Sequence, residues 1–97
     1  MKLLTLITAI IAVTLASCKK ERNKTVTVIK DCTGAYLRDN GKDFHVCNPE
    51  KVASFENGSE VISNYKKLKV CNGSAKDDIV CEMLHINEGW VEVEKIE

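Results

Sequence analysis

The chain has 97 residues, with 14 basic and 14 acidic side chains and a formal net charge of zero. This length allows only one small domain, and the balanced charge gives no global attraction to nucleic acid. We therefore expect no nucleic-acid partner and no function that depends on a large core or a strongly basic surface.

The amino-terminal segment, residues 1–17, has the layout of a secretory signal. Lys2 is followed by an apolar run from Leu3 to Leu15 and then by small residues, which is the usual order in such signals. A retained membrane span is the less favoured alternative, because the run is shorter than the roughly 20 residues that a spanning helix needs. Residues 1–17 are therefore predicted to be a signal peptide.

The signal ends in Leu15-Ala16-Ser17-Cys18, which matches a lipobox and resembles that segment of bacterial lipoprotein precursors. The resemblance implies a lipid on the thiol of Cys18, cleavage between Ser17 and Cys18, and acylation of the new amino terminus, with palmitate as an expected modification. Setting Cys18 aside leaves four of the five cysteines, the even number that a disulfide framework in an oxidising compartment needs.

Residues 18–24 are predicted to be the lipidated terminus and a flexible tether, because Lys19 to Lys24 are all polar. In a sharper alternative, the basic residues of this segment lie against anionic lipid headgroups. Lysine stands at position 19, where aspartate in the resembled Gram-negative lipoproteins favours retention at the inner membrane. The expected location is therefore the cell envelope, anchored in the outer membrane on its periplasmic or surface face.

A small β domain is predicted for residues 25–97. The β-branched run from Thr25 to Ile29 is typical of a strand, which we place at 25–31. Gly34, among small polar neighbours, indicates a bulge or a sharp bend after it.

The pair Asn40-Gly41 is favoured in two-residue type I′ turns, so residues 35–46 are predicted to form a hairpin. This loop pairs Arg38 with Asp43 and Tyr36 with His45, and we expect both pairs outside the barrel. The core face of the hairpin is then predicted to consist of Ala35, Leu37, Phe44 and Val46.

After the hairpin, Asn48-Pro49-Glu50 is typical of a helix start, and a short helix carrying Val52 and Phe55 on one face is expected. Alternating patterns predict further strands at 60–69, 79–86 and 90–96, with a polar loop at 71–78. The fold class is therefore all-β, as a small bent meander or an OB/SH3-like barrel of five to six strands with one short helix.

The four remaining cysteines, Cys32, Cys47, Cys71 and Cys81, are predicted to form two disulfides. The favoured pairing joins Cys71 to Cys81 across the polar loop and Cys32 to Cys47 at the base of the hairpin. The other two pairings stay open, because Cys32 lies two positions away from the residue opposite Cys47.

Two short segments, His45-x-Cys47 and Cys81-x-Met83-x-His85, place soft donor atoms two residues apart, on one face of an extended chain. Such donors suit cuprous copper or zinc, so a metal-binding envelope lipoprotein is one alternative. The favoured interpretation is two cystines without metal or cofactor, because an oxidising compartment removes the free thiols.

No catalytic motif occurs at a recognisable spacing in the sequence, so the protein is predicted not to be an enzyme. The predicted function is a lipid-anchored, non-enzymatic binding or accessory module, with another envelope protein or an envelope ligand as its expected partner. Tyr36 and Trp90 are the candidate surface aromatics. In the alternative, Trp90 caps the barrel and Tyr36 covers the cystine on the outer face of the hairpin.

The domain also resembles small uncharacterised lipoproteins of Gram-negative bacteria in three segments, Asp31-Cys32-Thr33-Gly34, Gly41-Lys42-Asp43 and Gly89-Trp90-Val91. Membrane-bound lysozyme inhibitors are likewise small, cystine-bearing β lipoproteins, so an envelope enzyme inhibitor of that kind is a further alternative. The serine-glycine loop with which those inhibitors act is not found between the predicted strands.

Overall fold

The computed structural model describes residues 20–77 and 81–97. The predicted signal peptide, residues 1–17, and the predicted lipid attachment site, Cys18, lie outside the described residues, as do Ile79 and Val80. In the part of the chain that is described, no helix is long and apolar enough to cross a membrane.

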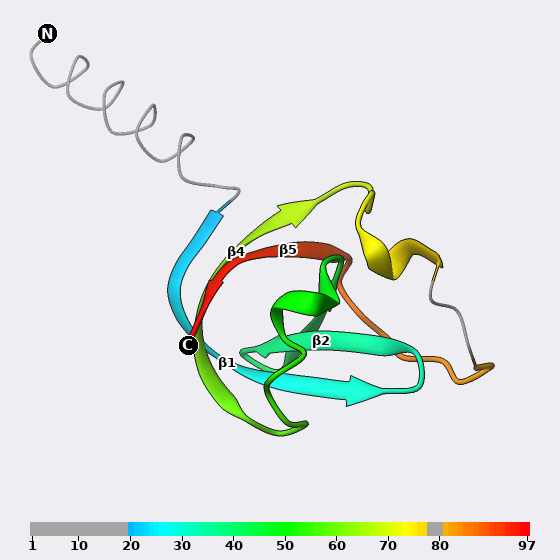
Figure 1. Cartoon of the computed structure of the whole chain (residues 1–97), viewed down its shortest axis with the longest axis horizontal. Helices are drawn as coiled ribbons and strands as arrows, with labels where there is room; N and C mark the ends of the chain where they lie inside the picture. Colours follow the sequence, from blue (N-terminus) through cyan, green and yellow to red (C-terminus); the bar gives the residue numbers. More distant parts are fainter. Residues whose placement is uncertain (1–19, 78–80) are drawn as a thin grey trace, which may run out of the picture.

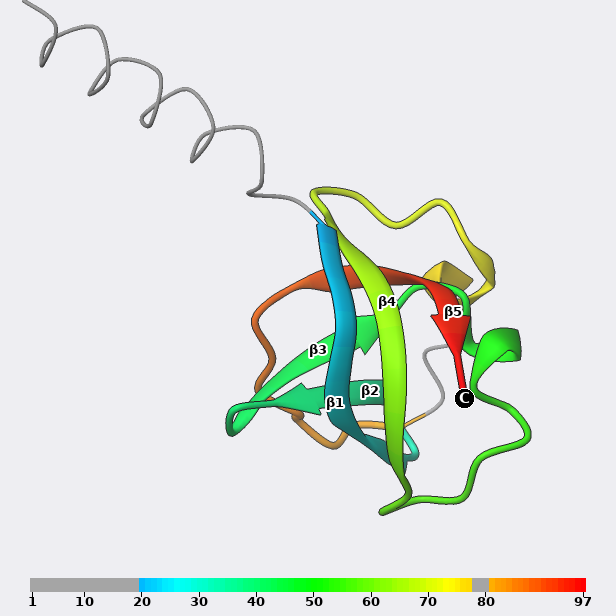
Figure 2. The same cartoon turned by 90° about the vertical axis from the view of Figure 1, so that its left-hand side faces the viewer.

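The described residues form five strands, β1 (Lys20–Asp31), β2 (Gly34–Asp39), β3 (Lys42–Val46), β4 (Glu60–Leu68) and β5 (Trp90–Ile96). They close into a barrel in the order β1-β2-β3-β5-β4, in which only β3 and β5 are parallel (Figures 1 and 2). The predicted all-β fold is confirmed. Its strand order, with a short helical turn between β3 and β4, is that of an OB-type barrel.

Strand β1 closes the barrel because it pairs with two neighbours along its length. Its second half, from Thr27 to Asp31, pairs with β2, and its first half, from Lys20 to Thr27, pairs with β4. A bulge near Asn23 bends the first half, and the backbone N–H of Asn23 donates to Oδ1 of Asn64 over 2.7 Å. Residues 20–24 are therefore strand and not the predicted flexible tether, because backbone pairing with β4 orders a segment that has no apolar pattern.

The hairpin has its predicted register, with Arg38 opposite Asp43 and Tyr36 opposite His45. Asn40 and Gly41 have φ angles of 52° and 76°, as a type I′ turn requires. All four residues predicted for its core face are buried in one hydrophobic cluster, which consists of Val26, Val28, Ala35, Leu37, Phe44, Val46, Val52, Val61, Tyr65, Val91 and Val93.

Two predicted elements differ in the structure. The helix after Asn48 is only a 3-10 turn, η1 (Pro49–Lys51), although Val52 is buried and Phe55 packs against the core as expected. The second difference is the predicted strand at 79–86, of which residues 81–86 form no strand. A closed barrel leaves no free sheet edge for another strand to join, and residues 81–89 instead cross the outer face of the hairpin. We call residues 81–89 the strap.

Two disulfides are confirmed, but the favoured pairing is wrong. Cys32 is bonded to Cys81, and Cys47 to Cys71, with Cα–Cα distances of 5.9 and 5.5 Å. The strap carries Cys81 back to the end of β1, which places it beside Cys32. The second disulfide lies below Trp90, in a small cluster with Leu68 and Ala75 between the ends of β3 and β4.

Candidate functional site: the strap on the outer face of the hairpin

The strap covers the outer face of β2 and β3 around Tyr36 and Asp43. Tyr36 is 1% exposed and Asp43 is 9% exposed, although both point away from the barrel core as predicted. The segment that covers them belongs to the connection between β4 and β5, which also contains the short turn η2 (Ser74–Asp77). The site is therefore built from a surface strand pair and a segment distant in sequence.

His85 fastens the middle of the strap to two strands. Its Nδ1 lies 2.5 Å from Oδ2 of Asp31, at the end of β1, and its Nε2 lies 2.6 Å from Oδ2 of Asp43, in β3. Asp43 also accepts from Arg38, over 2.7 Å from Nε and 3.0 Å from Nη2. Because both ring nitrogens face carboxylates, each of them donates, and the ring is the charged imidazolium.

The pKa values of this cluster agree with the charged form. Burial lowers the pKa of His85, but the hydrogen bonds to Asp43 and Asp31 outweigh that effect, so the pKa is raised. The bonds from Arg38, followed by those from His85, hold the pKa of Asp43 below its ordinary value despite burial. For Asp31, bonds from Thr33 and His85 overcome the opposing effect of burial and lower the pKa.

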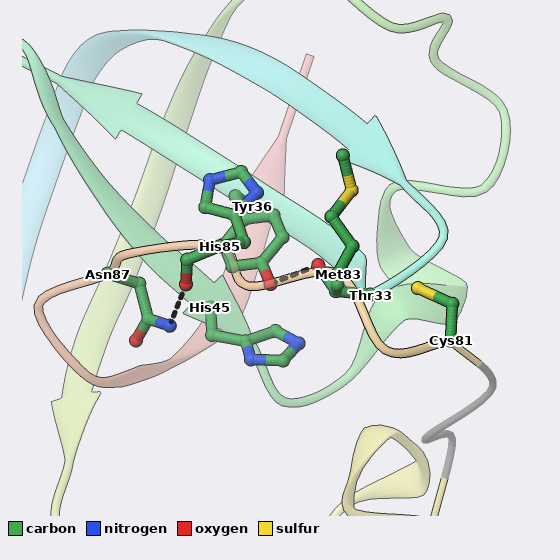
Figure 3. A pocket seen from close by; sticks show the side chains of 7 residues that line it. All are labelled: Thr33, Tyr36, His45, Cys81, Met83, His85 and Asn87. Carbon is green, nitrogen blue, oxygen red and sulfur yellow. Dashed lines mark hydrogen bonds between the residues drawn. The ribbon is translucent and has the colours of Figure 1, made fainter.

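A stack of four rings continues from His85 across the hairpin. The ring centroids of His85 and Tyr36 are 3.6 Å apart and those of Tyr36 and His45 are 4.5 Å apart; Figure 3 draws these three rings. The centroids of His45 and Trp90 are 4.1 Å apart. Burial, together with the charge of His85, lowers the pKa of His45, which favours the neutral form of this ring. The stack thus joins the strap, the hairpin and the start of β5.

The hydroxyl of Tyr36 is also held. It lies 2.6 Å from Oγ1 of Thr33, whose own hydroxyl donates to Oδ1 of Asp31, so the Tyr36 hydroxyl is the donor of the pair. Burial raises the pKa of Tyr36. Next to it, Gly34 adopts a φ of +139°, and a Cβ at this position would lie 2.6 Å from Nε2 of His45. Glycine therefore allows the ring of His45 to approach the backbone of β2.

A cavity of about 210 Å³ lies between the strap and the hairpin and is lined by Thr33, Tyr36, His45, Cys81, Met83, His85 and Asn87 (Figure 3). It brings together four of the five residues of the predicted metal site. The fifth, Cys47, is in the other disulfide. Cys81 is oxidised as well, and both nitrogens of His85 are bonded to carboxylates. Both thiolates and the imidazole of His85, which the metal alternative needs, are therefore already engaged.

The strap is fastened at both ends as well as in the middle. Its first residue, Cys81, is disulfide-bonded to Cys32. At its other end, the backbone N–H of Glu88 donates to the carbonyl of Asp43, and the carbonyl of Gly89 accepts from the N–H of His45, both over 2.8 Å. The conformation of the strap is therefore determined by contacts to the barrel.

Large apolar side chains on the strap point into solvent. Leu84 is 85% exposed, Ile86 is 81% exposed and Met83 is 57% exposed, whereas His85 between them points to the barrel. The predicted surface aromatics are placed differently: Tyr36 is buried beneath His85, and Trp90 is half-buried against His45 and the Cys47–Cys71 disulfide. The prediction that Tyr36 belongs to an exposed binding surface is therefore wrong.

The sequence analysis missed Asp31 and Asp43 as partners of His85 and missed Leu84 and Ile86 as exposed residues. The only local signal was the alternation around His85, which we interpreted as a strand. That alternation does place His85 on one side and its apolar neighbours on the other. The side that faces the barrel, however, is the one with His85, and the apolar neighbours face the solvent.

Comparisons with protein-family models, with curated proteins and with solved structures found no match to this chain. The fold and the site themselves define a class: a small, disulfide-stabilised OB-type barrel whose β4–β5 connection is folded back as a strap over β2 and β3.

Proposed function

We propose that this protein is a lipid-anchored, non-enzymatic binding module of the cell envelope, and that the strap is its protein-binding surface. The observation that carries the proposal is the exposure of Leu84 and Ile86, 85% and 81%, on a backbone fastened at both ends. Exposed apolar side chains grouped on one segment are typical of interaction sites. A fastened strap also loses little conformational freedom on binding, which favours affinity.

The position of the strap fits this proposal. In OB folds, the face of the second and third strands and the loop between the fourth and fifth strands contact ligands. Here that loop lies on that face, so the strap replaces the bare sheet as the surface offered to a partner. The groups beneath it hold one another: His85 bonds two carboxylates and the hydroxyl of Tyr36 bonds Thr33. Such saturation favours a structural role for these residues over proton transfer.

The charges around the strap indicate the chemistry of the partner. Glu82 and Glu88 are exposed on either side of Leu84 and Ile86, so an apolar centre has an acidic rim. Complementary charges at the rim of an interface select partners and speed their association. We therefore expect an envelope protein with a shallow apolar groove bordered by lysine or arginine.

Site-specific photocrosslinking in intact cells tests the proposal. A photoreactive residue at position 84 is expected to give a discrete crosslinked protein, and one at exposed Glu56, in the loop after η1, is expected to give none. The crosslinked partner, once purified, should bind Leu84→Ser/Ile86→Ser at least tenfold more weakly than the wild type.

The matched control is Ile62→Ser/Val70→Ser, which removes exposed apolar side chains elsewhere, 46% and 67% exposed in the wild type. This variant should retain full affinity. Equal crosslinking from positions 84 and 56, or equal affinity of the two double variants, would exclude the strap as the binding surface.

A further inference from the structure

One end of the barrel carries a cluster of lysines. Lys66, Lys67 and Lys69, with Leu68, line a cavity of about 500 Å³ at the end of β4, and Lys20 at the start of β1 pairs in register with Lys66. We call Lys20, Lys66, Lys67 and Lys69 the basic end.

Only part of this charge is neutralised. Lys66 is 3.2 Å from Glu92 and Lys20 is 3.4 Å from Glu94. Among the side chains described in residues 20–75 and 81–97, exposed Lys67 and Lys69 have no carboxylate partner, and Lys67 lies over the ring of Phe44. Val70, directly after Lys69, is 67% exposed. The basic end therefore offers free ammonium groups beside an apolar side chain, a combination that suits the headgroup region of a membrane.

The chain also limits how far this end can be from a lipid on Cys18. Lys20 is the second residue after Cys18 and is already part of β1, and two residues span at most roughly 7 Å. The segment of the strap from Cys81 to His85 lies at the other end of β1, where Cys81 is bonded to Cys32 and His85 to Asp31. Strand β1 has 12 residues from Lys20 to Asp31, so its two ends are separated by roughly 36 Å measured along the chain. Figures 1 and 2 show the start of β1 apart from this segment of the strap, which is drawn in orange near the end of β1.

We propose that the basic end is a membrane-docking surface for anionic phospholipid headgroups, which turns Leu84 and the Cys81 end of the strap away from the bilayer. This inference rests on the proposed lipid anchor and adds to it the lipid class and the orientation of the barrel. The anchor supplies proximity, the lysines bind the phosphate groups of the lipids, and Val70 enters the interface. Each lysine close to such a surface contributes a factor of roughly five to association.

Lysine footprinting on the lipidated protein tests this inference. The protein is reconstituted into vesicles of phosphatidylcholine, with or without phosphatidylglycerol, and the acetylation rate of each lysine is measured by mass spectrometry. We expect Lys67 and Lys69 to react at least fivefold more slowly on the anionic vesicles. Lys30 and Lys51, which lie away from this end, should change less than twofold. In 1 M salt, where charges are screened beyond about 3 Å, the difference should disappear.

A variant pair tests whether the lysines act together. Lys67→Gln/Lys69→Gln should abolish the protection of neighbouring Lys66, whereas Lys30→Gln/Lys51→Gln should leave it intact. Equal rates on both vesicle types, in protein that still floats with the vesicles, would overturn the docking surface and leave the anchor standing. Failure to float with either vesicle type would overturn the anchor. Equal protection of Lys67 and Lys69 by free inorganic phosphate on neutral vesicles would also overturn membrane docking.

Discussion

His85 is the residue on which the outer face of the barrel depends. It contacts β1 through Asp31, β3 through Asp43 and β2 through the ring of Tyr36. One side chain thus attaches the strap to three strands, and it does so as a cation between two anions. The stability of this arrangement must therefore vary with pH.

The direction of the pH dependence follows from the shifted pKa values. The pKa of His85 is raised on folding, so its contribution is complete below the ordinary histidine value of about 6.5 and is lost as the pH rises through the raised value. The pKa values of Asp31 and Asp43 are lowered, so their contribution is complete above about pH 4 and is lost as the pH falls through the lowered values. We expect the free energy of unfolding, measured by denaturant titration, to be highest between about pH 4.5 and 6.5.

Replacing His85 tests this explanation. His85→Gln should lower the free energy of unfolding by about 3 kcal/mol near pH 6, because it leaves Asp31 without a cation and Asp43 with Arg38 alone. It should also flatten the decline above pH 6.5. The control is His45→Gln, which removes a ring whose pKa is lowered by burial and should keep that decline. A decline that persists unchanged in His85→Gln would contradict this role.

At the scale of elements, the strap is held by a disulfide that the barrel itself does not need for closure. Cys32–Cys81 spans 49 residues and attaches the strap to the end of β1, whereas Cys47–Cys71 spans 24 residues and joins the ends of β3 and β4. The loop lengths alone predict losses of about 4 and about 3.5 kcal/mol, respectively, when each pair is replaced by alanine. The two variants should differ more in which segments open locally than in the free energy of unfolding.

Native-state hydrogen exchange distinguishes the two disulfides. The amide protons of Glu88 and His45 form hydrogen bonds between the strap and the hairpin. In Cys32→Ala/Cys81→Ala, these amide protons should exchange at least tenfold faster, because the strap is no longer covalently attached and can open locally. In Cys47→Ala/Cys71→Ala, their exchange should change only as much as the global stability does. Unchanged protection in the first variant would show that His85 alone fastens the strap.

At the scale of the whole molecule, a lipid on Cys18 would place a compact barrel directly on the membrane, since β1 begins at Lys20. Replacing this cysteine tests the anchor. Cys18→Ala should convert a protein that partitions into the detergent phase into an unprocessed precursor, because the residue that receives the lipid is gone. Phase partitioning and intact mass measure both effects. Continued cleavage at the same bond, with normal release, would contradict the lipobox interpretation.

Features that depend on local patterns could be predicted from the sequence alone. Alternation of apolar residues predicted β4 and β5 to within one residue at each end, and Asn40-Gly41 predicted the hairpin register, because side-chain direction and turn geometry are set by adjacent residues. The four cysteines that remain after Cys18 is assigned to the lipid predicted two disulfides, because this count depends on composition alone.

Only the tertiary structure decided the disulfide pairing, the burial of Tyr36, the strand character of residues 20–24 and the strap. Each depends on residues far apart in the chain: Cys32 pairs 49 residues away and Asp31 bonds His85 54 residues away. No local pattern encodes such contacts. They follow from closure of the barrel, which gives residues 20–24 a partner in β4 and leaves no sheet edge for the segment around His85, so that this segment binds the outer face of the hairpin instead.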